Sequence, residues 1–71
     1  EQGQKEEALA SLERAVRLDP GNAEAWLSLA RLRDADGDPQ GARDFALRAL
    51  SVAGDEPETA RSARRFLDRL Q

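Results

Sequence analysis

The sequence has no cysteine, no histidine and no methionine, and its aromatic residues are limited to Trp26, Phe45 and Phe66. Without cysteine it cannot form a disulfide framework, a thiol nucleophile or a thiolate metal site. Without histidine it has no imidazole base, no Ser-His-Asp triad and no histidine-ligated metal. These absences exclude the commonest catalytic and metal centres, so we expect a protein that is not an enzyme and needs no cofactor.

Long apolar runs are missing as well. None approaches the roughly 20 residues that a helix needs to span a bilayer, and no signal-peptide pattern opens the sequence. We therefore expect no membrane partner, while the lack of cysteine is compatible with either the cytoplasm or the periplasm. Because the sequence has no methionine and starts at Glu1, we expect it to be a piece of a longer protein.

The net charge of −3 is unevenly distributed over the 71 residues. Residues 1–56 carry an excess of acidic side chains, whereas residues 57–71 carry an excess of arginine. An acidic body opposes general binding to a phosphate backbone, which needs a broad basic face, so we expect no nucleic-acid partner. The arginines of the last segment either contact an anion or form a solvated helix face.

Regular turn signals divide the chain into segments with helical periodicity. We expect the first helix over residues 5–18 and the second from an Asn22 cap up to Gly37. The third is expected to start at the pair Asp38-Pro39. The fourth is expected to run from an Asp55-x-x-Glu58 capping box to Leu70. No segment alternates with period two, so the sequence predicts an all-α fold. Short loops predict that consecutive helices pack antiparallel. The apolar stripe of the first helix is expected to include Ala8, Leu9, Leu12, Ala15, Val16 and Leu18.

The chain repeats itself with a period of 34 residues. That shift pairs Gly3 with Gly37, Ala8 with Ala42, Ala15 with Ala49, Glu24 with Glu58, Ser28 with Ser62, Arg31 with Arg65 and Asp34 with Asp68. A helix-turn-helix unit of this period is typical of a helical solenoid.

These residues resemble the tetratricopeptide repeat family. Residues 22–50 are similar to a full repeat, with Trp26, Leu29 and Ala30 at the positions of its first helix. The resemblance implies a right-handed superhelical solenoid fragment of four helices in a single domain. Its parts would be the second helix of a truncated repeat (1–22), one full repeat (23–56), and a C-terminal capping helix or the first helix of a further repeat (57–71).

Three departures from the family pattern are notable. Arg33 stands where the family prefers tyrosine, and in the last segment Arg64 replaces a small residue while Ala60 replaces tryptophan. These changes favour a capping helix with a polar outer side over an ordinary repeat helix.

The resemblance implies a scaffold that binds a peptide or a partner domain in a concave groove lined by the first helices of the repeats. The groove residues would be Glu24, Leu27, Ser28, Arg31, Asp34, Arg61, Ser62 and Arg65, with Glu58 and Asp68 beside them. Helical spacing independently places the polar members on one side of each helix, where the arginines suit carboxylate or carbonyl groups. Equally, they fit a solvated surface of ordinary exposed residues, on which Glu24 and Ser28, and Arg31 and Asp34 or Arg65 and Asp68, neutralise each other locally.

Other specific sites are not expected. Some tetratricopeptide proteins hold a C-terminal carboxylate with a lysine and asparagine clamp, which this sequence lacks because Ser28 stands at the asparagine position. Asp34-x-Asp36-x-Asp38 imitates the start of a calcium loop, but Phe45 occupies the position of its closing glutamate, so we expect no metal.

Two alternatives to partner binding remain open. In the first, the face of the first helix that carries Ala8, Leu12 and Ala15 pairs with another copy, which makes the chain a homo-oligomerisation segment. In the second, the chain is a non-catalytic appendage of a larger enzyme or assembly factor.

Overall fold

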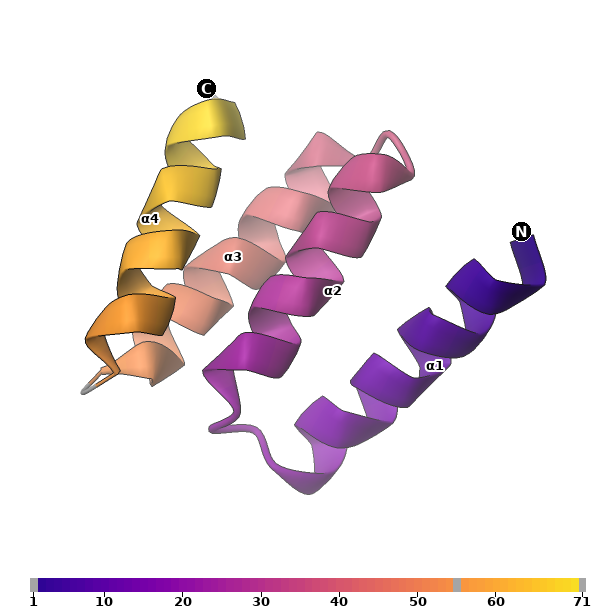
Figure 1. Cartoon of the computed structure of the whole chain (residues 1–71), viewed down its shortest axis with the longest axis horizontal. Helices are drawn as coiled ribbons and strands as arrows, with labels where there is room; N and C mark the ends of the chain where they lie inside the picture. Colours follow the sequence, from indigo (N-terminus) through magenta and orange to yellow (C-terminus); the bar gives the residue numbers. More distant parts are fainter. Residues whose placement is uncertain (1, 55, 71) are drawn as a thin grey trace.

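The computed structural model describes residues 2–54 and 56–70, and this part of the chain folds into four helices with no strand. They are α1 (Gln2–Leu18), α2 (Ala23–Ala35), α3 (Pro39–Ala53) and α4 (Pro57–Leu70). Consecutive helices run in opposite directions, so α2 and α4 point the same way, with α3 between them and deeper in the view (Figure 1). The predicted all-α class is confirmed.

Local capping residues set most of the helix boundaries. The side-chain oxygen of Asn22 accepts a hydrogen bond from the Ala25 amide at 3.2 Å, and Asp38 Oδ1 accepts one from the Gly41 amide at 3.0 Å. Each cap satisfies an amide that has no partner within its own helix. Gly37 has a φ of 79°, which confirms the predicted left-handed glycine after α2.

The fourth helix was predicted to open with a capping box of Asp55 and Glu58. Asp55 lies outside the described residues. The first hydrogen bond of α4 instead runs from the Ala60 amide to the Glu56 carbonyl at 3.0 Å, which fixes the start of this helix at Pro57.

The first helix begins earlier than predicted but ends at Leu18, as predicted. It begins at Gln2 rather than at residue 5. Gly3 therefore lies in the first turn of α1, where backbone amides have no hydrogen-bond partner within the helix. The prediction that Leu18 belongs to the buried stripe is wrong, since its side chain is 79% exposed. Leu18 follows the buried Val16 by two residues, a rotation of about 200° that turns it to the opposite side of the helix.

The main core forms around a row of alanines on α3. Its members are Ala42, Ala46, Ala49 and Ala53, of which none is more than 2% exposed. They recur at intervals of three and four residues and so lie on one face of the helix. Leu27 and Ala30 of α2 and Ala63 and Phe66 of α4 pack in one cluster with Ala42, Ala46 and Ala49. We call the four alanines the alanine row.

A second, smaller cluster joins α1 to α2. Val16, Ala25 and Leu29 are its buried members, and Leu9, Leu12 and Ala15 of α1 are partly buried against them. Ala8, which the sequence placed in the same stripe, is exposed. The face of α1 is therefore buried only along the side that meets α2.

Trp26 and Phe45 connect the two clusters. Their rings stack with centroids 5.8 Å apart, and the indole nitrogen of Trp26 donates a hydrogen bond to the Pro20 carbonyl at 2.8 Å. The Arg48 guanidinium lies 5.0 Å from the Trp26 ring, and that of Arg33 lies 6.0 Å from Phe45. Arg33, at a family tyrosine position, thus contributes a cation–π contact to the same aromatic pair.

The Asp38 cap gives the first testable prediction. We expect Asp38→Ala to lower the free energy of unfolding by about 1 kcal/mol, because the Gly41 amide loses its acceptor. For a domain of this size that corresponds to a loss of about 4–8 °C in melting temperature, measured by circular dichroism. Asp44→Ala, the same substitution at an exposed position of α3, is the control and should leave the melting temperature nearly unchanged. Equal effects of the two changes would contradict the assigned cap.

Candidate functional site

Two adjoining hollows lie between α2 and α4. The first, of about 340 Å³, is lined by Glu24, Leu27, Ser28, Arg31, Glu58, Thr59 and Ser62. The second, of about 110 Å³, is lined by Arg31, Ser62, Arg65, Phe66 and Arg69. Because the two share Arg31 and Ser62, they adjoin each other along both helices. We call the two together the α2–α4 groove.

The groove has an apolar floor and a charged rim. Leu27 and Phe66 are 3% and 5% exposed, so only a small part of each side chain reaches the surface of the floor. Ser28 and Ser62 are half-buried, whereas the arginines and glutamates along the rim are exposed. A ligand in the groove would therefore meet hydroxyls and two buried apolar side chains in the middle and charges at the edges.

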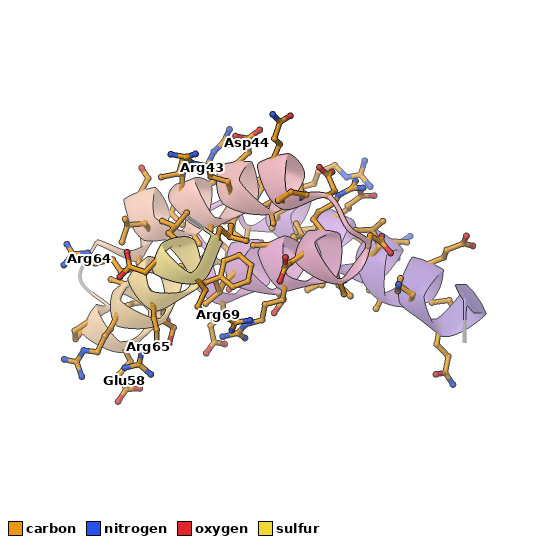
Figure 2. All side chains as sticks on the ribbon, turned by 90° about the horizontal axis from the view of Figure 1, so that it is seen from above. Arg43, Asp44, Glu58, Arg64, Arg65 and Arg69 are labelled. Carbon is orange, nitrogen blue, oxygen red and sulfur yellow. The ribbon has the colours of Figure 1, made fainter. Side chains whose placement is uncertain are left out.

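The two helices present their groove residues in register. α2 and α4 run in the same direction, and a third hollow, at their N-terminal ends, is lined by residues of both helices (Figure 1). Figure 2 shows Glu58, Arg65 and Arg69 on one side of the molecule and Arg43 and Asp44 of α3 on the opposite side. The groove thus lies on the face away from the exposed surface of α3.

Six of the eight predicted groove residues line this groove. They are Glu24, Leu27, Ser28, Arg31, Ser62 and Arg65. Asp34 and Arg61 are not among its lining residues: Asp34 is half-buried in the last turn of α2, and Arg61 is exposed on α4. Arg61 corresponds to Leu27 under the 34-residue shift, but no helix covers it in the way that α4 covers Leu27.

Three lining residues were missed by the sequence reasoning. Thr59 precedes Ser62 by three residues, and Arg69 follows Arg65 by four, so helical spacing along α4 could have identified both. Phe66 was assigned to the core, where it lies, but it also lines the smaller hollow, and the Arg69 guanidinium lies 6.0 Å from the centre of its ring.

The groove arginines have no carboxylate partner among the described residues, where the one ion pair joins Lys5 Nζ to Asp36 Oδ1 at 2.8 Å. Arg31 is therefore not paired with Asp34, and Arg65 is not paired with Asp68, although both arginines are exposed, as they would also be on a solvated surface. Their guanidinium groups keep their hydrogen-bond donors available to a ligand.

The acidic residues between α2 and α3 serve the fold. Asp36 binds Lys5 of α1, and Asp38 caps α3. Over residues 2–54 and 56–70, no group of three or more acidic side chains is arranged to hold a metal ion. None of the helices described is both long enough and apolar enough to cross a membrane.

Paired antiparallel helices with a groove between the first helices of successive pairs define a helical solenoid of the helix-turn-helix type. The family model described as "Tetratricopeptide repeat" matches residues 1–58, and the chain belongs to the tetratricopeptide repeat family. A comparison with curated proteins found no match. Repeats of this family generally mediate protein–protein interaction or scaffolding and are generally not catalytic.

The division between floor and rim gives the second prediction. We expect Leu27→Ala to lower the free energy of unfolding by about 2–5 kcal/mol, because it leaves a cavity between α2, α3 and α4. Leu47→Ala, the same substitution at a side chain that is 48% exposed on α3, should change it by less than about 0.5 kcal/mol, as should Arg31→Ala on the rim. Urea unfolding followed by Trp26 fluorescence measures all three. A large loss for Arg31→Ala would contradict its assignment to the rim.

Proposed function

We propose that this chain is a protein-interaction module that binds a peptide, or an exposed segment of a partner protein, in the α2–α4 groove. The observation that carries the proposal is that two adjoining hollows lie between α2 and α4 and share Arg31, which carries no ion pair among the described residues. Protein-binding grooves combine buried apolar contact with a few placed polar groups, and this one offers both.

Each part of the groove would recognise a different part of a ligand. Arginine presents a planar set of donors that fits carboxylate and carbonyl oxygens, so Arg31 and Arg65 would bind acidic side chains or backbone carbonyls. The hydroxyls of Ser28 and Ser62 can donate to or accept from a peptide backbone. Leu27 and Phe66 would contact a small apolar side chain at the floor.

We infer that the chain has no catalytic activity of its own. Its sequence contains neither the histidine nor the cysteine that most acid–base and nucleophilic catalysts use. Its polar groove residues are exposed or half-buried, which suits recognition better than chemistry that requires a water-excluded site.

The binding proposal is tested by removing the two arginines. Arg31→Ala with Arg65→Ala should weaken capture of a protein partner by about tenfold, since contacts between exposed charged groups contribute about 0.2–1 kcal/mol each. The measurement is affinity capture with the protein as bait, followed by titration of the captured partner by calorimetry.

The matched control is Arg43→Ala with Arg64→Ala. It makes the same change of charge on exposed residues of α3 and α4 that do not line the groove (Figure 2). This control should bind the partner as the unmodified chain does. Equal losses in the two double variants, or no loss in either, would refute binding in the groove.

We also propose that α4 closes the stack of helices on its side. Leu27 and Ala30 of α2 are buried against α3 and α4. The 34-residue shift places Arg61 and Arg64 at these two positions of α4, and both are exposed. Arginine at these positions would leave buried charges under a further helix, which is costly without partners. The outer side of α4 therefore suits solvent.

Self-association through α1 is a second candidate function, favoured by a different observation. Ala8, Leu12 and Ala15 of α1 correspond under the same shift to three members of the alanine row, which are fully buried. In α1 the equivalent residues are exposed or half-buried. An apolar stripe of this kind suits pairing with the α1 of a second copy.

Two alanines of α1 provide a matched test of self-association. Ala8 and Ala10 are both exposed, and they are separated by about 200° around the helix. Ala8→Glu should shift the sedimentation profile toward monomer, because it places a charge in the paired face, and the more disruptive Leu12→Glu should do the same. Ala10→Glu should leave the profile unchanged. A monomeric unmodified chain at millimolar concentration would rule out this candidate.

A further inference from the structure

The α2–α4 groove has an acidic end and a basic end. Glu24 and Glu58 line the groove at the N-terminal ends of α2 and α4, and Glu56 lines the third hollow beside them. Arg65 and Arg69 line the opposite end of the groove. Arg31 lines both hollows of the groove and so lies where they meet. Because α2 and α4 are parallel, their acidic ends coincide and so do their basic ends (Figure 1).

The same spacing occurs on both helices. Arg31 follows Glu24 by seven residues, and Arg65 follows Glu58 by seven. At a rise of 1.5 Å per residue, each pair is separated by about 10 Å along the helix axis. Glu24 and Glu58 lie in the first turn of their helices, where the helix dipole favours acidic side chains.

The middle of the groove is neutral. Ser28 and Ser62 lie between the glutamate and the arginine of their helices, and both are half-buried. No ion pair links the acidic end to the basic end in the described residues. The two charge clusters therefore act on a ligand as separate sites about 10 Å apart.

We propose that the groove selects a peptide segment that presents a cationic and an anionic side chain about 10 Å apart on one face. The inference rests on the proposed binding function and adds to it the chemical class and the orientation of the ligand. The lysine or arginine of the segment lies at the glutamate end, and its aspartate or glutamate lies at the arginine end.

A polyproline II segment with its two charges three residues apart fits this requirement. That conformation has three residues per turn and rises 3.1 Å per residue, so side chains at i and i+3 lie on one face about 9 Å apart. A segment with two charges of the same sign meets attraction at one end and repulsion at the other, which gives selectivity.

The test uses four blocked hexapeptides and the full chain. Each peptide has alanine at both ends and the core Lys-Pro-Pro-Glu, Glu-Pro-Pro-Lys, Glu-Pro-Pro-Glu or Lys-Pro-Pro-Lys. Affinities are measured by titration of amide NMR signals at low ionic strength. We expect the tighter mixed-charge peptide to bind about fivefold more tightly than either same-sign peptide, which corresponds to exchanging one exposed ion pair for a repulsion. In about 1 M salt the difference should disappear.

Charge reversal provides the decisive variant. Glu24→Arg with Glu58→Arg makes both ends basic, so its preference should move to Glu-Pro-Pro-Glu by a similar factor. Glu6→Arg with Glu7→Arg makes the same change of charge on exposed residues of α1 that do not line the groove, and it should keep the preference of the unmodified chain.

Failure of the charge-selection inference can be distinguished from failure of the proposed binding function. Equal affinities for the four peptides, no binding of any of them, or no change of preference in the Glu24 and Glu58 variant overturns the charge-selection inference. Partner capture that survives Arg31→Ala with Arg65→Ala overturns the proposed binding function itself. Lost capture in that variant together with equal peptide affinities leaves the groove as a binding site and removes only its selectivity.

Discussion

Close packing of α3 against two helices at once is the constraint on which the structure depends. The alanine row presents only methyl groups, so α2 and α4 can both approach the α3 backbone closely. Sharing one small-residue face brings α2 and α4 next to each other in parallel. The groove between them is a consequence of this packing, and larger side chains in the row would force the helices apart.

The groove separates stability from recognition within a few residues of the same helices. Leu27 and Phe66 belong mainly to the core, and their burial holds α2 and α4 in place. One turn or less away, Arg31 and Arg65 are exposed and contribute little to folding. If the groove binds as proposed, change in the rim alters the ligand without altering the fold.

Sequence reasoning recovered the features that depend on local signals or on the repeat. Asn22 and Asp38 mark helix starts because a short polar side chain can cap an amide without any tertiary contact. The 34-residue period placed Ser28 and Ser62 on the same side of two parallel helices, and both line the groove. These predictions needed only the chain itself.

The remaining features depend on which neighbours a residue meets. Leu18 has the hydrophobicity of a core residue, but α1 packs on α2 alone, so the opposite side of α1 stays exposed. Arg61 has the helical spacing that predicts a groove residue, but it is not among the residues that line the groove. Arg33 replaces a family tyrosine, and its contact with Phe45 emerges only from the packing of α2 on α3.

The most direct test of this account is a measurement of nuclear Overhauser contacts from the methyl groups of the alanine row in the full chain. If α3 is the shared support of the groove, these methyls show contacts to protons of both α2, including Leu27 and Ala30, and α4, including Ala63 and Phe66. Contacts to only one of the two helices would contradict the account, because α2 and α4 would then not form a groove.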